Sequence, residues 1–183
     1  MPFTAMAQDD MYSSSDKKPK VKIANDVVNG KGERFVFTKT KVFANTKDKG
    51  YFSFGAGGIC FGTDTIINLD VRIVSTTSLK IEKGMMLLLK TFKGNIITLH
   101  ANTTNEDYLR DAQGYYDLTA NYEISDEQVN LLRKEGLAKV RAETKYGNFD
   151  KEYDKNKAGN YVVACFDLVS SEMRKPKSFT DGF

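Results

Sequence analysis

Hydrophobic and polar residues alternate along many segments of this 183-residue chain, and this period of two constrains the fold more than any other feature. The clearest case lies within residues 65–74. Apolar and polar residues alternate there in an unbroken series: Ile67, Asn68, Leu69, Asp70, Val71, Arg72 and Ile73. Successive side chains of a β-strand point to opposite faces of a sheet, so the series predicts a strand with one buried face.

Other segments rich in β-branched and aromatic residues predict further strands. These segments cover residues 21–28, 34–44, 85–92, 95–101, 115–124, 137–144 and 148–153. Asn29-Gly30, Lys93-Gly94 and Tyr146-Gly147 each separate two neighbouring segments, and glycine tolerates the positive φ angle that a tight hairpin turn requires. The pattern therefore predicts antiparallel hairpins.

Two segments depart from the period of two and predict helices. Ser125-Asp126-Glu127-Gln128 is a capping box, which satisfies backbone N–H groups at a helix start, and Gly136 is a suitable stop. They predict a short internal helix at about 126–135. Apolar residues at spacings of three and four predict a C-terminal helix at about 160–173: Tyr161, Val162, Cys165, Leu168 and Val169. The fold class is therefore α+β, mainly an antiparallel β sheet or sandwich with these two helices.

Composition indicates one globular domain between two polar ends. Hydrophobic residues make up 40% of the chain, charged residues make up 28%, and the formal net charge is +3. No apolar stretch approaches the roughly 20 residues that span a bilayer. Residues 8–20 are polar and low in complexity, and we expect a flexible tether there. The expected globular domain covers residues 21–173, and residues 174–183 form a second flexible tail.

The first seven residues favour export. Ala5-Met6-Ala7 has small residues at both outer positions and is followed by the polar Gln8, as at a signal-peptidase cleavage site. We therefore expect residues 1–7 to be the remnant of a secretory signal and the protein to be periplasmic or secreted. An ordinary polar N-terminus is the alternative, because Ala-x-Ala occurs often by chance.

The C-terminal third resembles a group of small exported proteins of unknown function from Gram-negative gut anaerobes. The resemblance covers about residues 115–170. It lies in the order of a strand at 122–124, the Ser-Asp-Glu-Gln helix start, Leu131-Leu132 and the hairpin strand at 138–144. The resemblance implies an exported domain and supplies no catalytic residues.

Two motifs that suggest ligand chemistry lack required residues. The glycine-rich segment 55–62 is followed by Thr63-Asp64, where a phosphate loop needs lysine and Ser/Thr, so we predict a bend or bulge between two strands. Asp150, Glu152 and Asp154 alternate as at the start of a calcium loop. That loop requires glycine and glutamate at later positions, which are occupied by Lys155 and Tyr161, so a solvated strand face is favoured.

Histidine and cysteine offer little material for catalysis. A catalytic role for the single histidine, His100, needs a nucleophile and an orienting acid, which the fold could bring from anywhere in the chain. A lone histidine is more often structural or exposed, so we assign no catalytic, cofactor or metal residue. Cys60 and Cys165 are a candidate disulfide if the protein is exported. The alternative is that Cys165, on the apolar helix face, is a free thiol that packs as a small hydrophobe.

The leading functional hypothesis is an exported, non-enzymatic binding or accessory domain of the cell envelope, whose partner is an unidentified envelope protein or glycan. One alternative is a glycan-directed hydrolase that uses carboxylates such as Glu106, Asp107 and Asp111. Another is a phage or cell-surface structural subunit. Lysines in the front half lie near phenylalanines, but their alternation suits the two faces of a strand, so no nucleic-acid partner is expected.

Overall fold

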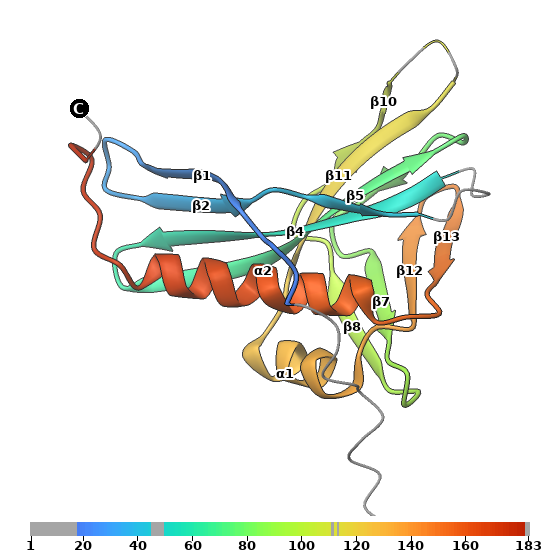
Figure 1. Ribbon diagram of the computed structural model, residues 1–183. Helices are drawn as coiled ribbons and strands as arrows, with labels where there is room; N and C mark the ends of the chain where they lie inside the picture. The colour runs from blue at the N-terminus through green and yellow to red at the C-terminus, as the bar shows by residue number, and fades with distance from the viewer. Residues whose placement is uncertain (1–17, 45–49, 111, 113, 182–183) are drawn as a thin grey trace, which may run out of the picture.

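The computed structural model describes residues 18–44, 50–110, 112 and 114–181. It confirms an α+β fold of mainly antiparallel sheet with two helices (Figure 1). The expected signal remnant at residues 1–7, and residues 8–17 of the expected tether, lie outside the described residues.

A seven-stranded sheet forms the larger part of the molecule. Its strands are β1 (Ile23–Val28), β2 (Arg34–Thr38), β3 (Lys41–Phe43), β4 (Gly50–Phe61), β5 (Asp64–Ser75), β10 (Tyr108–Leu109) and β11 (Tyr116–Glu123). The order is β1-β2-β4-β5-β11-β10, and β3 also pairs with β4. The long antiparallel hairpin of β4 and β5 is the centre of this sheet and pairs along the whole of both strands.

Residues 55–61 of the glycine-rich segment lie inside strand β4, so the predicted bend or bulge is wrong for them. Only Gly62, with a φ of 63°, lies in the turn between β4 and β5. Close packing explains the glycines. A Cβ atom on Gly58 would lie 2.7 Å from Cγ1 of Val169, and one on Gly57 would lie 2.7 Å from the ring of Phe37. These glycines allow a helix and a neighbouring side chain to approach an extended strand. Glycines are also common in turns, so the composition of the segment does not show which of the two structures it forms.

The single strand predicted at residues 34–44 is divided into β2 and β3. β2 pairs with the C-terminal half of β4, whereas β3 pairs with Phe52, Ser53 and Phe54 near its beginning. Thr38 is the last residue of β2, and its hydroxyl accepts a hydrogen bond at 2.9 Å from the backbone N–H of Ala56, which lies between the parts of β4 that pair with β2 and with β3. A side chain therefore takes the place of a backbone partner there.

A four-stranded sheet of order β13-β12-β7-β8 contains both hairpins predicted in the second half. Its strands are β7 (Met86–Lys90), β8 (Ile96–His100), β12 (Lys139–Thr144) and β13 (Gly147–Glu152). Gly94 and Gly147 have the positive φ angles expected of turns, 93° and 125°. Two short strands, β6 (Lys80–Ile81) and β9 (Asn105–Glu106), pair separately.

Both helices lie where the sequence places them. α1 (Asp126–Glu135) has the predicted bounds, its capping box is formed on both sides, and Gly136 ends it with a φ of 69°. α2 (Lys157–Met173) begins slightly before the predicted residue 160. α2 lies along β4 and β2, with α1 beside it (Figure 1).

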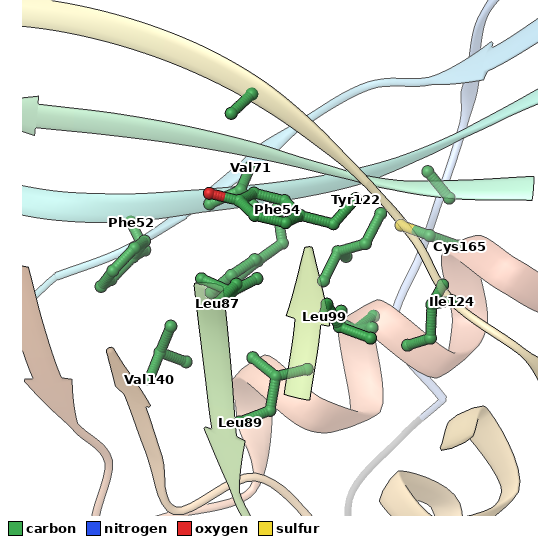
Figure 2. Close-up of a cluster of buried hydrophobic side chains, with 14 of the residues drawn as sticks. Phe52, Phe54, Val71, Leu87, Leu89, Leu99, Tyr122, Ile124, Val140 and Cys165 are labelled. Carbon is green, nitrogen blue, oxygen red and sulfur yellow. The ribbon is translucent and has the colours of Figure 1, made fainter. Parts of the chain in front are cut away.

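One core joins the two sheets and the helices. The hairpin β4–β5 contributes Phe52, Phe54 and Val71, and β7 and β8 contribute Leu87, Leu89 and Leu99 (Figure 2). Helix α2 contributes four of its five predicted apolar residues as fully buried side chains: Tyr161, Val162, Cys165 and Val169. Leu168 is only half-buried.

The described part of the expected C-terminal tail contacts the seven-stranded sheet. Arg34 donates a hydrogen bond to the backbone oxygen of Lys175 at 2.5 Å. The Lys177 ammonium lies 3.1 Å from a carboxylate oxygen of Asp26 in β1. Lys175 and Lys177 therefore have partners in β2 and β1, and the mobility of the tail stays a prediction.

Candidate functional site

One face of the β4–β5–β11 layer carries a row of polar side chains. Because side chains alternate along each strand, Leu69, Val71 and Ile73 point into the core and the residues between them point the other way, away from α2. The strand register places Arg72 opposite Thr119, Asp70 opposite Asn121 and Asn68 opposite Glu123. We call this row the polar face: Asn68, Asp70, Arg72, Asp117, Thr119, Asn121 and Glu123.

Asp70 lies at the centre of the polar face and is 8% exposed. Its Oδ1 atom accepts a hydrogen bond from the Asn121 amide at 2.6 Å. Burial raises the pKa of Asp70 to about 6, and the hydrogen bond from Asn121 opposes that rise in pKa. Gly57 makes room for this carboxylate, because a Cβ atom there would lie 3.2 Å from Oδ2 of Asp70.

Amide side chains extend the network beside Asp70. The Asn102 amide donates to Oδ1 of Asn68 at 2.9 Å, and the backbone N–H of Asn102 donates to the backbone oxygen of Asn121 at 3.0 Å. Asn102 follows β8, next to an isolated bridge between Ala101 and Tyr122. The loop after the smaller sheet therefore supports the polar face of the larger one.

An arginine–carboxylate pair occupies the other end of the polar face. Arg72 donates from both Nε and Nη2 to Asp117, with an Nε–Oδ1 distance of 2.8 Å. These bonds lower the pKa of Asp117, and Tyr108 adds a further hydrogen bond. Nearby, Arg110 donates to the hydroxyl of Tyr51 at 2.7 Å. Tyr108, which pairs with Asp117, is 61% exposed and places an aromatic ring at this end of the polar face; we call this ring the aromatic rim.

The polar face thus offers donors, acceptors and a neutralised ion pair on a rigid framework of paired strands. Thr119 and Glu123 are exposed, whereas Asn68, Asp70 and Asp117 are buried. Such an arrangement suits recognition of a ligand rich in hydroxyl groups, since neutral amides and fixed carboxylates bind hydroxyls directionally. The alternation in β5 is visible in the sequence, but the polar face is not, because neither segment alone shows that β5 pairs with β11.

Of the three carboxylates of the hydrolase alternative, the two that the structure describes each have a separate local partner. Glu106 lies 2.6 Å from the Lys80 ammonium and is exposed. Asp107 accepts hydrogen bonds from the hydroxyl of Ser78 and the backbone N–H of Leu79. Asp111 lies outside the described residues.

The remaining sequence candidates have local partners. Nδ1 of His100 lies 3.0 Å from the backbone oxygen of Gly84. Asp150 forms an ion pair with Arg141 at 2.6 Å, and Glu152 forms one with Lys139 at 2.9 Å. In the part of the chain that the structure describes, no three metal-ligating side chains gather in a group that could hold an ion.

Both cysteines are free thiols. Sγ of Cys60 lies 3.7 Å from the backbone oxygen of Gly62 at the tip of the β4–β5 hairpin. Cys165 is fully buried, and burial raises the pKa of its thiol to about 11. Pairing of the two under oxidising conditions stays a prediction, which an intact mass measured with and without reductant checks.

Neither described helix has the length and apolar character needed to cross a membrane. Comparison of the chain with known protein families, with curated proteins and with solved structures finds no match.

Proposed function

We propose that this chain is an exported, non-enzymatic binding domain of the cell envelope and that the polar face holds a glycan. The observation that carries the proposal is the row of cross-strand polar pairs around the hydrogen bond between the buried Asp70 and the half-buried Asn121. Export rests on the Ala5-Met6-Ala7 pattern and on the resemblance over residues 115–170.

The spacing of the polar face favours an extended ligand. Alternate residues on one face of a strand are about 6–7 Å apart, so the pairs from Asn68–Glu123 to Arg72–Thr119 present groups at regular intervals. Tyr108 lies at one end, and an exposed aromatic ring with a polar tip packs against a sugar ring while its edge stays hydrated. A glycan matches both the hydroxyl-binding groups and the aromatic rim.

A carboxylate-based hydrolase is the second candidate, supported by different residues from those expected. Glu123 lies opposite Asn68, and Asn121 lies opposite Asp70, so Glu123 and Asp70 are diagonal neighbours on one face. The Cα atoms of diagonal neighbours are about 7–8 Å apart. Side chains on such positions can bring two carboxyl groups to the separation of about 6.5–9.5 Å that inverting glycosidases use. The raised pKa of Asp70 is that of a candidate acid, and Glu123 is exposed.

Binding to an array of neutral and acidic oligosaccharides, followed by calorimetry on the best hit, tests the proposal. We expect Tyr108→Ala and Thr119→Lys to weaken binding by about tenfold or more, a loss of about 1.4 kcal/mol. The matched controls are Tyr146→Ala, at a tyrosine 64% exposed, and Thr98→Lys, at an exposed threonine of the smaller sheet. Equal losses in the controls, or no bound oligosaccharide, contradict the polar face as the site.

The same samples separate binding from hydrolysis. Mass spectrometry of the bound oligosaccharide after prolonged incubation should show an unchanged ligand. Shortened products that disappear in both Asp70→Asn and Glu123→Gln would establish the hydrolase instead. Fractionation of the native host, with an intact mass that starts at Gln8, tests export; a cytosolic protein that retains Met1 contradicts it.

A further inference from the structure

Strand β5 extends beyond β11, the strand that pairs with one of its two edges. It pairs with β4 from Asp64 to Ser75, but β11 pairs only with Asn68 to Ser75. β11 ends at Glu123, where the chain leaves the sheet to enter α1 (Figure 1). Residues 64–67 therefore have a strand on one side only among the described residues, and every second residue of an edge leaves its backbone N–H and C=O unpaired.

A groove of about 450 Å³ lies against this free edge. Thr65, Ile66 and Ile67 form one wall, the last turn of α2 forms another, and residues 123–126 close the end. Ile66, Ile67, Ile124 and Met173 make part of the lining apolar. Open space beside unpaired strand backbone, with apolar side chains on both sides of it, is the geometry in which an extended peptide adds to a sheet.

The charges on the two sides of the groove have opposite signs. Arg174, at the end of α2, is exposed, and among the described residues it has no ion-pair partner. Glu123 and Asp126 lie on the other side, are exposed, and likewise form no ion pair with a described residue. A strand in the groove would match this surface with an acidic side chain toward α2 and a basic one toward α1.

We propose that the free edge of β5 at residues 64–67 binds an extended segment of a partner protein, which pairs with β5 where β11 ends. The segment has apolar side chains at alternate positions and charged side chains of opposite sign on its two sides. This interaction does not depend on the glycan site, because residues 64–67 lie beyond the cross-strand pairs around Asp70. Glu123 is the one residue that belongs both to the polar face and to the lining of the groove.

Selection from a displayed library of 12-residue peptides against the full-length protein tests the proposal. We expect enriched peptides to alternate apolar residues and to bind with hydrogen-exchange protection confined to the amides around residues 64–67. Ile66→Lys should weaken binding of the best synthetic peptide by about tenfold or more, since an edge lysine blocks strand addition. Ile96→Lys is the matched control, on an exposed strand isoleucine of the smaller sheet, and should change binding less than about twofold.

Two further variants define the mode of binding. The same peptide with N-methylated backbone amides at alternate positions should lose binding, because methylation removes the N–H groups that would donate hydrogen bonds to β5. Its side chains are unchanged, so the loss would identify backbone pairing as the mode of binding. Arg174→Glu should weaken the binding of peptides that carry the acidic residue, whereas Lys134→Ala on α1 should leave their binding unchanged. Tyr108→Ala should leave peptide binding unchanged. Loss of glycan binding and loss of peptide binding at the β5 edge are therefore distinguishable.

Several results overturn the proposal: no enriched peptide, equal binding to the Ile66→Lys protein, or undiminished binding of the N-methylated peptide. The alternate amides of residues 64–67 that pair with β4 are protected in any case. Protection of the remaining amides, which point to the free edge, in the protein without peptide would show that its own chain covers the edge. Protection that rises with protein concentration would identify a second copy as the occupant, which also excludes a partner segment.

Discussion

At the residue scale, Asp70 has the most unusual surroundings of the carboxylates on the polar face. Its pKa of about 6 lies above the ordinary value of 3.8, and the cause is burial. The folded protein therefore binds the Asp70 proton more tightly than the unfolded chain between about pH 4 and pH 6. The contribution of this side chain to stability is greatest below pH 4 and falls as the pH rises through 6.

Asp70→Asn should remove the dependence of stability on pH that Asp70 causes. The amide keeps an acceptor for Asn121 and carries no charge, so we expect the free energy of unfolding to rise at pH 7 by at most about 3 kcal/mol and to change little near pH 4. Urea unfolding of both proteins at the two pH values measures the difference. Asp64→Asn, at an exposed position of the same strand, is the control. An equal effect of Asp70→Asn at both pH values would contradict the raised pKa of Asp70.

Two buried tyrosines give a second prediction at this scale. The hydroxyl of Tyr122 is buried and has no hydrogen-bond partner among the described residues, and its side chain points into the core cluster (Figure 2). The hydroxyl of Tyr161 instead donates to the backbone oxygen of Lys39 at 2.6 Å. Tyr122→Phe should therefore leave the unfolding free energy unchanged or raise it slightly, whereas Tyr161→Phe should lower it by about 1 kcal/mol.

Thermal and denaturant unfolding of the two variants measured side by side check this prediction. Each variant removes one oxygen from a buried ring, so the comparison isolates the hydrogen bond from the loss of volume. A larger destabilisation by Tyr122→Phe than by Tyr161→Phe would show that the Tyr122 hydroxyl has a partner.

At the element scale, the contact between α2 and β4 depends on glycine. Val169 and Met173 of α2 pack directly over Gly58, with Cγ of Met173 3.1 Å from the position of a Cβ atom. Gly58→Ala should therefore push the helix away from the strand and lower the unfolding free energy by about 1–3 kcal/mol.

Gly30→Ala is the matched control, because a Cβ atom at this turn position meets nothing within 4 Å and the backbone there has no positive φ. Its unfolding midpoint should lie close to that of the wild type. Equal midpoints for both variants would mean that α2 adjusts to the extra methyl group without cost.

Asn156 explains why the sequence predicts the start of α2 only approximately. It stands at the N-cap position, but its side chain makes no capping bond to its own helix. Its Oδ1 atom instead accepts from the backbone N–H of Leu137 at 2.9 Å, and its amide donates to Asn160. The side chain therefore joins the end of α1 to the beginning of α2, a role that neither segment shows alone.

At the scale of the whole molecule, one core cluster contains residues of both large sheets and both helices. We therefore expect one cooperative unfolding transition. The chain has no tryptophan and nine tyrosines, so far-ultraviolet circular dichroism and tyrosine fluorescence supply two independent probes. Their urea transitions should coincide. Two separate midpoints would mean that the smaller sheet unfolds independently.

Interactions between near neighbours in the chain account for the elements that the sequence predicted well. The bounds of α1 follow from its capping box and Gly136, which act within a few residues of each other. The hairpins β7–β8 and β12–β13 follow from alternation on either side of a glycine turn. The glycine-rich strand was mistaken for a bend because its glycines respond to Phe37 and Val169, which are distant in the sequence.

The α+β class, both helices, most strands and the assignment of Leu69 and Asp70 to opposite faces of β5 follow from the amino-acid sequence, because each depends on contacts within one turn or one strand. The hydrogen bonds of Asp70 with Asn121 and of Arg72 with Asp117, and the extension of β5 past β11, are visible only in the folded chain. Those features depend on register and on close approach between distant segments. Many registers satisfy the same alternation, and packing of the whole chain selects one of them.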